Sequence, residues 1–468
     1  MNKSMMKSRV KKFCLMNKKI SRKKFIKNIS VFSIGMFAFS NMLFAAEKGI
    51  LKILNILPIQ NDPKGILNLI KGFNYKIISK KGQKMSDGLT VPDHADGMAS
   101  FKGDNGKIIL VRNHEIGHFK TIEKLLDKNP MQKNKKFINK FSKYMYDSGQ
   151  NNSPCGGGTT TLVYNPKTQK VETEYLSLAG TLVNCGGGIT PWGSWISCEE
   201  TVATKNKSLT KNHGYNFEVR PTEEVKLNKA IPLKDMGRFR HEAIAIDPRT
   251  SIAYQTEDRD DGLIYKFIPN VKTQYAKGGK LQALIIKDGI GNDTRNWEKV
   301  NYKKNIKYNV DWLDLDEIDN PKDDMRYRAA KKGAAVFARP EGMWYDNDYV
   351  YFTCTTGGVK KIGQVWKMNL SNQTLEMIFE SYSSDVMKKC DNMTIAPWGD
   401  VVICEDGKGK DRLIGLKQDG STYIIAENFL NNAEFAGVNF APDGKTLFVN
   451  IYSPTMTIAI TGPWEELV

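Results

Sequence analysis

The sequence lacks most of the short motifs that identify common enzyme classes. It has no G-x-S-x-G nucleophile elbow and no G-x-x-x-x-G-K-[ST] phosphate loop, so serine-hydrolase and P-loop nucleotide chemistry have no support. Its five histidines do not form a zincin pattern. None of its seven cysteines has C-x-x-C spacing, which argues against a zinc ribbon. Any chemistry must therefore depend on other residue types.

Long hydrophobic runs are scarce, and the clearest one lies near the N-terminus. Residues 1–27 carry eleven Lys or Arg and no acid, residues 29–46 are apolar, and Glu47 opens a polar sequence. This layout predicts a cleaved export signal over residues 1–46. The segment SRKKFIK resembles the twin-arginine export motif, with Lys23 in place of the second arginine. We therefore expect a periplasmic protein with no membrane span after cleavage, because no other run is long and apolar enough.

The positive charge is unevenly distributed. Of the formal net charge of +18, the first 27 residues account for 11, so the remaining chain is only modestly basic. This distribution argues against a nucleic-acid partner, and a modest positive charge suits anionic small molecules as well as any other partner. Nothing in the sequence demands more than a monomer. Six cysteines follow the signal, and an exported protein could pair them in disulfides. Cys155 and Cys185, each followed by three glycines, are one candidate pair.

Beyond Glu47 the sequence predicts an all-β structure. Short runs rich in Val, Ile, Tyr and Thr recur between turn residues, for example KIILVRN, TTTLVYNP, IAYQTED, YVYFTCTT, DVVICED and TLFVNIYS. Two segments depart from this pattern. Residues 120–146 are Lys-rich with helical spacing, and residues 272–332 form an irregular stretch that ends in a short helix. We interpret both as insertions.

Internal repeats indicate how the strands are organised. PWGSWISCEE at 191–200 recurs as PWGDVVICED at 397–406. Three other segments begin with Glu242, Glu341 or Glu434, continue as a strand, turn on Asp and return as a second strand. A repeated strand-turn-strand unit is typical of a β-propeller. At roughly 40 to 50 residues per blade, residues 47–468 predict a single propeller domain of six blades with insertions near 120–146 and 272–332.

The repeats also predict a metal site. The turns at one end of propeller blades converge on the central channel, so acids that are distant in sequence would meet there. The candidates are Glu115, Glu199, Glu242, Glu257, Glu341, Asp391 and Glu405, with Glu200, Asp258 and Asp406 as neighbours. So many carboxylates share a small volume at neutral pH only with cations, because like charges raise each other's pKa. Hard oxygen ligands suit Ca²⁺ and Fe³⁺. The alternative is that the acids cap turn amides.

A cysteine accompanies the acids. Cys198 directly precedes Glu199 and Glu200, and a thiolate among oxygen ligands indicates a redox-capable or softer transition metal beside calcium. The alternative for Cys198 is a small buried side chain at the end of a strand.

Taken in order, CGGGITPWGSWISCEET, RHEAIAIDP, YQTEDRDDGLIYKFIP, ARPEGMWYD, DNMTIAPWGDVVICEDG and EFAGVNFAPDGKTLFVNIYSP resemble the PhoX-type alkaline phosphatases. These are exported bacterial phosphatases with a β-propeller fold. The resemblance extends from about Gly88 to Trp464. It implies hydrolysis of phosphomonoesters with two ferric and three calcium ions. It departs from the family at Cys390, where a proline usually precedes Asp391.

The resemblance also implies roles for individual residues. Cys198 would be the thiolate ligand of iron, and Arg339 would contact the phosphoryl oxygens. The carboxylate ligands would be drawn from Glu115, Glu199, Glu242 or Glu257, Glu341, Asp391 and Glu405. The sequence leaves open which member of each neighbouring acid pair points inward.

The chemistry of phosphoryl transfer agrees with this set of residues. The reaction needs positioning and cancellation of charge on the phosphoryl oxygens more than it needs a side-chain base. Clustered cations and an arginine fork supply both. Two alternatives remain. A calcium-dependent hydrolase of the lactonase type would have no use for a thiolate ligand, and a binding propeller without enzymatic activity would use the acids only as caps.

Overall fold

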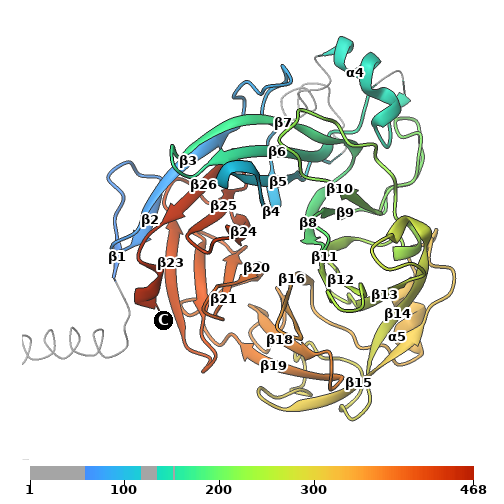
Figure 1. The fold of residues 1–468 in the computed structure, drawn as a ribbon. Helices are drawn as coiled ribbons and strands as arrows, with labels where there is room; N and C mark the ends of the chain where they lie inside the picture. The colour runs from blue at the N-terminus through green and yellow to red at the C-terminus, as the bar shows by residue number, and fades with distance from the viewer. Residues whose placement is uncertain (1–57, 118–133, 151–152, 468) are drawn as a thin grey trace, which may run out of the picture. The chain divides into compact units, whose positions relative to one another are not determined.

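The computed structural model describes residues 58–117, 134–150 and 153–467. The predicted export signal lies outside these residues, as does much of the predicted insertion at 120–146. Pro58–Glu466 form one compact unit. Its strands are arranged in antiparallel sheets around a common centre, as Figure 1 shows. This arrangement confirms the predicted all-β propeller class.

The strands of the first half of the chain form two small sheets and part of a larger one. The first sheet contains β4 (Ala95–Lys102), β5 (Ile108–His114), β6 (Gly157–Asn165) and β7 (Lys170–Thr181). The second contains β8 (Asn184–Ile189), β9 (Trp195–Glu199) and β10 (Asn216–Val219). The larger sheet begins with β11 (His241–Ile246), β12 (Ala253–Glu257), β13 (Ile264–Pro269), β14 (Gly279–Ile286) and β15 (Lys307–Asp314).

The second half of the chain completes the ring of sheets. The larger sheet continues from β15 through β19 (Thr374–Glu380), β18 (Gln364–Asn369) and β17 (Tyr349–Cys354) to β16 (Pro340–Asp346). The next sheet contains β20 (Cys390–Ile395), β21 (Val401–Glu405), β22 (Arg412–Leu416) and β23 (Thr422–Asn428), extended by β2 (Leu67–Ile70) and β1 (Ile59–Gln60). The last sheet contains β24 (Phe435–Phe440), β25 (Thr446–Ile451), β26 (Met456–Thr461) and β3 (Asn74–Lys80).

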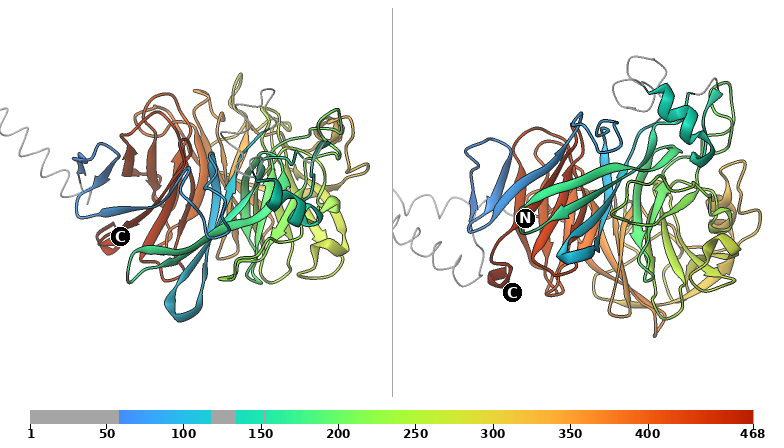
Figure 2. Two further views of the ribbon diagram at one scale, coloured as in Figure 1. Left: turned by 90° about the horizontal axis from the view of Figure 1, so that it is seen from above. Right: turned by 45° about the horizontal axis from the view of Figure 1, so that its top comes forward.

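The last sheet joins the two ends of the described chain. Strand β3 pairs antiparallel with β26, with Lys80 opposite Met456 and Asn74 opposite Thr461. The ring is thus closed by backbone hydrogen bonds between segments far apart in sequence. In Figure 2 the blue and red ends of the propeller lie side by side.

Helices are few and short among the described residues. They are α4 (Lys135–Phe141) and α5 (Met325–Lys331), with the 3-10 helices η1 (Asp104–Gly106), η3 (Ser142–Tyr144), η5 (Lys234–Met236), η6 (Tyr275–Lys277) and η7 (Trp464–Leu467). No helix within the described ranges is long and apolar enough to cross a membrane.

The segment 272–332 is more regular than predicted. It contains β14 and β15, which connect the two parts of the nine-stranded sheet, in addition to the short helix α5. In β15 the side chains of Tyr308 and Val310 are buried and those of Lys307, Asn309 and Asp311 are exposed. This alternation is the signature of a half-buried strand. The charged residues around it hid the pattern in the sequence.

Six strands, namely β4, β8, β11, β16, β20 and β24, line the centre in that order within the described chain. Neighbouring inner strands approach so closely that side chains are excluded at several points. A Cβ atom on Gly186 of β8 would lie 2.3 Å from the carbonyl oxygen of Glu242 of β11, and one on Gly342 of β16 would lie 2.4 Å from that of Asp391 of β20. Glycine is therefore required where the inner strands cross.

Apolar side chains fill the space between adjacent sheets. One cluster, which includes Phe337, Phe352, Trp366 and Leu375, lies between the two parts of the nine-stranded sheet. A second cluster, which includes Val365, Phe379, Ile403 and Ile414, packs β17–β19 against β20–β22. These apolar clusters pack neighbouring sheets against one another.

Candidate metal centre

The six inner strands begin with the same backbone junction. Each inner strand pairs with the strand that follows it in the chain. The carbonyl of the residue before the inner strand accepts a hydrogen bond from the backbone N–H of the residue just after that paired strand. The pairs are Glu115 to His94 (2.9 Å), Glu200 to Val183 (2.8 Å), Asp258 to Arg240 (3.2 Å), Thr355 to Arg339 (2.9 Å), Asp406 to Lys389 (2.9 Å) and Tyr452 to Glu434 (3.1 Å). We call these twelve residues the junction ring.

A β-bulge follows each junction. In five inner strands the register shifts directly after the first paired residue, and in β24 it shifts one residue later. A bulge bends the strand and re-aims the side chain at that point. The residue at this second position is Asp96, Cys185, Glu242, Glu341 or Asp391 in five strands and Ala436 in the sixth. The repeated bulge thus presents one carboxyl or thiol side chain from each of five strands.

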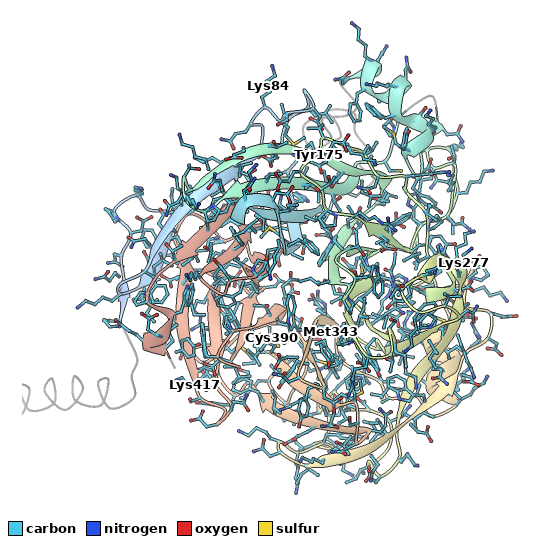
Figure 3. All side chains as sticks on the ribbon, viewed as in Figure 1. Lys84, Tyr175, Lys277, Met343, Cys390 and Lys417 are labelled. Atoms are coloured by element: carbon cyan, nitrogen blue, oxygen red, sulfur yellow. The ribbon has the colours of Figure 1, made fainter. Side chains whose placement is uncertain are left out.

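These side chains join the acids of the junction ring in four overlapping groups. The groups are Asp96–Glu115–Cys185, Cys185–Glu200–Glu242, Glu242–Glu341–Asp391 and Asp391–Asp406–Glu434, and the ligand atoms within each lie within 4.8 Å of one another. Successive groups share Cys185, Glu242 or Asp391, so they form one continuous arc. We call these nine residues the channel cluster. In Figure 3 the label of Cys390, which precedes Asp391, lies near the centre of the ring.

The channel cluster is electrostatically unfavourable without cations. Burial and repulsion from Asp391 raise the pKa of Glu115 to about 7, and burial and repulsion from Asp406 raise the pKa of Asp391 to about 6. Burial and neighbouring carboxylates also hold the pKa values of Asp96, Glu200, Glu242, Glu341 and Glu434 well above their usual range. Both carboxylate oxygens of Glu242 and Oδ1 of Asp96 are buried and accept no hydrogen bond in the described structure. These residues therefore fit a site for bound cations.

Cationic side chains of the junction ring flank the cluster. Arg339 donates from Nε to Oδ1 of Asp258 at 2.9 Å, and its Nη2 lies 2.6 Å from Oε1 of Glu341. Arg240 forms an ion pair with Glu200 at 3.2 Å. On the opposite side, the hydroxyl of Tyr452 donates to Oε2 of Glu115 at 2.5 Å. The cluster is therefore bordered by cations on one side and by neutral donors on the other.

The structure brings five of the predicted site residues together and separates four. Glu115, Glu242, Glu341, Asp391 and Arg339 lie at the cluster. The predicted ligands Glu199, Glu257 and Glu405 do not. Each is the last residue of a strand and turns into the sheet, while the next residue, Glu200, Asp258 or Asp406, follows the strand into the junction ring. Successive residues of a strand face opposite sides, so the second acid of each pair, rather than the predicted first, faces the junction ring.

The three separated acids have structural partners instead. Glu199 accepts hydrogen bonds from the backbone N–H groups of Leu182 and Gly214, and its Oε1 lies 2.7 Å from Nδ1 of His213. Glu257 accepts a hydrogen bond from the hydroxyl of Tyr265 at 2.7 Å. Glu405 forms an ion pair with Arg412 at 2.7 Å.

The predicted cysteine is also displaced from the site. Cys198 is fully buried in an apolar cluster with Ile196, Phe239 and Ile244, which agrees with the alternative of a small buried side chain. The thiol at the cluster belongs to Cys185. Cys155 and Cys185 are free thiols rather than a disulfide.

Sequence reasoning missed Asp96 and Cys185 and treated Glu434 only as the start of a repeat. One signal could have found the first two. Asp96, Cys185 and Glu341 are each followed by glycine at the start of an inner strand, because the next residue crosses close to the neighbouring inner strand.

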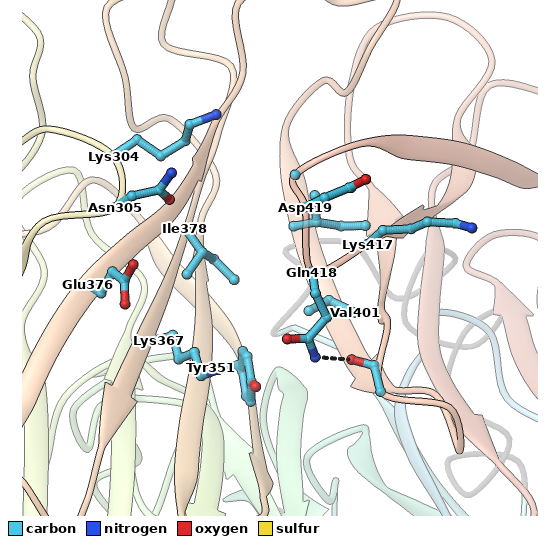
Figure 4. Close-up of a pocket in the computed structure, with 13 residues that line it drawn as sticks. Lys304, Asn305, Tyr351, Lys367, Glu376, Ile378, Val401, Lys417, Gln418 and Asp419 are labelled. Atoms are coloured by element: carbon cyan, nitrogen blue, oxygen red, sulfur yellow. Dashed lines mark hydrogen bonds between the residues drawn. The ribbon is translucent and has the colours of Figure 1, made fainter. Parts of the chain in front are cut away.

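Two other features of the molecule are not part of this centre. Asp147, Cys155 and His213 also lie close together, but Asp147 accepts hydrogen bonds from Gly149 and Thr210, and His213 is held by Glu199. A cavity of about 160 Å³ lies between β17–β19 on one side and β21, β22 and the turn after β22 on the other (Figure 4). Its wall includes Gly399, which accepts from Gln418, at the opposite end of β20 from Asp391. This cavity contains no residue of the channel cluster.

Comparisons with known proteins agree with the fold. The family model described as alkaline phosphatase PhoX matches residues 54–455. PhoX from Pseudomonas fluorescens, solved in complex with vanadate, a transition state analogue, is 17% identical with a TM-score of 0.63, over 87% of this chain and 97% of that chain. A putative gluconolactonase is 10% identical with a TM-score of 0.43, over 88% of this chain and 95% of that chain. A search of curated proteins found no match.

We expect Glu199→Gln and Glu200→Gln to have opposite consequences. The first change removes the charge that pairs with buried His213, so the free energy of unfolding should fall by about 3 kcal/mol. The second removes a carboxyl group buried among like charges, so the stability of the metal-free protein should stay within about 1 kcal/mol of the parent. Denaturant unfolding of both variants without metals would measure this. A larger loss for Glu200→Gln would contradict the assignment.

The raised pKa values predict that protons compete with cations. Carboxyl groups bind cations in their ionised form, and in the metal-free protein Glu115 and Asp391 ionise only as the pH rises through about 6 to 7. Calcium affinity should therefore fall steeply between about pH 8 and about pH 5, and calcium binding near neutrality should release protons. Titration calorimetry in buffers of different ionisation enthalpy measures both quantities. Affinity that is independent of pH would show that these carboxyls are already ionised.

Proposed function

The chain belongs to the PhoX family of alkaline phosphatases, whose model covers residues 54–455, and we propose that it hydrolyses phosphomonoesters at the channel cluster with bound iron and calcium. The observation that carries this proposal is the arc of nine acid and thiol side chains with buried carboxylate oxygens that lack hydrogen bonds. The substrates would be small phosphate esters.

The donor set supports more than one kind of cation. The groups around Cys185, which include Asp96, Glu115, Glu200 and Glu242, combine a thiol with carboxylates and suit ferric iron. The groups around Asp391, which include Glu341, Asp406 and Glu434, offer only oxygen and suit calcium. We propose two ferric and three calcium ions, as the family resemblance implies. When bound, such cations neutralise phosphoryl charge and lower the pKa of water toward neutrality.

Residues of the chain itself would orient the substrate. The planar guanidinium of Arg339 can grip two phosphoryl oxygens, and Asp258 and Glu341 hold it at the edge of the cluster. Arg339 adopts a φ of 48°, an uncommon conformation for a residue with a side chain. Its backbone is fixed by hydrogen bonds at both ends, from its N–H to Arg259 and to its carbonyl from Thr355. A pre-positioned donor of this kind stabilises charge without reorganisation during the reaction.

We also propose where the enzyme acts and in what oligomeric state. Residues 1–46 would direct export to the periplasm by the twin-arginine route, and residues 47–468 would act there as a single-domain monomer on phosphate esters. Export of a folded protein suits a domain that carries a preassembled metal cluster. The lactonase and binding alternatives have less support, because neither uses the thiol of Cys185 or the cations beside the cluster.

We expect the metal-loaded protein to release phosphate from a chromogenic phosphomonoester. Prior chelation should abolish turnover, because the carboxylates alone repel an anionic substrate, and iron together with calcium should restore it. Colorimetric phosphate assays before chelation, after chelation and after reloading provide the test. Turnover that is insensitive to chelation, or hydrolysis of a lactone in place of the phosphate ester, would refute the proposal.

The two cysteines offer a matched test of the thiolate ligand. Cys185→Ser should be purified with less iron and should lose any colour from an iron–thiolate bond, because a serine hydroxyl is a poor substitute for a thiolate. Cys198→Ser should keep its iron, since Cys198 is enclosed by apolar side chains, although its stability should fall. Elemental analysis and visible absorption spectra distinguish these outcomes. Loss of iron from Cys198→Ser alone would reverse the assignment.

A further inference from the structure

Three adjacent inner strands are each preceded by a cation at the same position of the junction ring. Arg240 precedes β11, Arg339 precedes β16 and Lys389 precedes β20, and these inner strands are adjacent. The other three positions hold His94, Val183 and Glu434. Positive charge is thus confined to one half of the ring entrance.

The backbone of Lys389 matches that of Arg339 in detail. Both residues have a left-handed φ, 50° for Lys389 and 48° for Arg339. The N–H of Lys389 donates to the carbonyl of Ile362 at 2.7 Å, and the N–H of Arg339 donates to that of Arg259 at 2.8 Å. Each backbone is therefore anchored to the loop that follows the strand paired with the preceding inner strand, β17 for Lys389 and β12 for Arg339. A residue with a side chain pays about 1 kcal/mol or more for this conformation. The two side chains therefore leave equivalent points of adjacent strands.

Lys389 differs from the two arginines in its partners. Arg240 pairs with Glu200, and Arg339 pairs with Asp258 and Glu341. The amine of Lys389 makes no hydrogen bond or ion pair with any described residue, although the side chain is partly buried. Its charged neighbours are Arg339, Asp406, Asp260 and Glu341. The carboxylates of Asp406, Asp260 and Glu341 are near enough to act on its charge but form no ion pair with it, so the ammonium can still contact an anion from outside the protein.

We propose that Lys389 is a second phosphoryl-binding cation, which acts together with Arg339 on the neighbouring inner strand. This inference rests on the proposed phosphatase function. A phosphomonoester dianion has more oxygens than one guanidinium fork can contact, and a lysine ammonium is a compact charge that can approach an oxygen left free by the arginine. The position corresponds to Arg339 by backbone geometry, so both cations face the same end of the channel cluster.

The neighbouring lysine provides a matched control. The amine of Lys388 donates to the carbonyl oxygens of Lys408 and Lys410 at 2.9 and 2.8 Å and pairs with Asp411 at 3.0 Å. The amine of Lys388 is therefore bound to the loop after β21. Lys388→Met removes the same charge one residue away, and Lys389→Met keeps the length and the backbone constraint of the original residue.

The experiment compares metal-loaded wild type, Lys389→Met, Lys388→Met and Lys389→Arg. With a phosphomonoester whose leaving group is uncharged, Lys389→Met should lower kcat/KM by about tenfold to a hundredfold, the usual effect of losing a charged hydrogen bond. The inhibition constant of inorganic phosphate should rise by a similar factor. Iron and calcium content and the thermal unfolding midpoint should not change. Lys388→Met should keep wild-type kinetics and phosphate inhibition, although its unfolding midpoint should fall because buried Asp411 loses its ion pair. Lys389→Arg should recover most of the loss.

Three results would overturn the assignment. They are wild-type kinetics and phosphate inhibition for Lys389→Met, a loss restricted to substrates with an anionic leaving group, and a loss of bound metal that accounts for the lost activity. Failure of the phosphatase function itself is recognised separately, because the wild type would then hydrolyse no phosphomonoester. In that case, calorimetric binding of inorganic phosphate to the wild type and to Lys389→Met would still decide whether Lys389 binds the anion.

Discussion

The close approach of the inner strands is the constraint on which the rest of this structure depends. At Gly186 and Gly342 one strand lies against the backbone of the next so tightly that no side chain fits. The residue before each of these glycines, Cys185 or Glu341, sits at a β-bulge and is directed to the channel cluster. The same stretch of backbone therefore packs the inner strands together and directs these side chains to the channel cluster. Ring closure by β3 and β26 keeps the six strand ends in place.

This arrangement has an electrostatic consequence. A ring of strand ends brings like charges together, and burial raises the pKa of the acids further. The free energy that folding supplies through the apolar clusters between sheets must offset this repulsion when no cation is present. Bound cations would make the electrostatic contribution of these acids to the stability of the folded state favourable, and metal loading would then be linked to stability.

The charge around the junction ring is asymmetric, because its cationic side chains lie on one side only. Arg240, Arg339 and Lys389 occupy equivalent positions on three adjacent strands, whereas Tyr452 and His94 on the other side contact Glu115. An anionic substrate that enters this end of the ring would meet positive charge on one side and ligand carboxylates below it. In the proposed function, the same backbone junction would supply metal ligands at some positions and substrate contacts at others, depending on the residue at each position.

The sequence by itself determined the propeller, because strand alternation, turn residues and the repeated segments are local patterns. It also identified Glu115, Glu242, Glu341, Asp391 and Arg339, which stand at the junctions of strands with strong signals. Only the tertiary structure decided between Glu199 and Glu200, between Glu405 and Asp406, and between Cys198 and Cys185. The physical reason is that neighbouring residues of a strand face opposite sides, and a bulge changes that alternation by one residue. The local sequence does not encode which side meets the channel, since that depends on how six distant strands pack against one another.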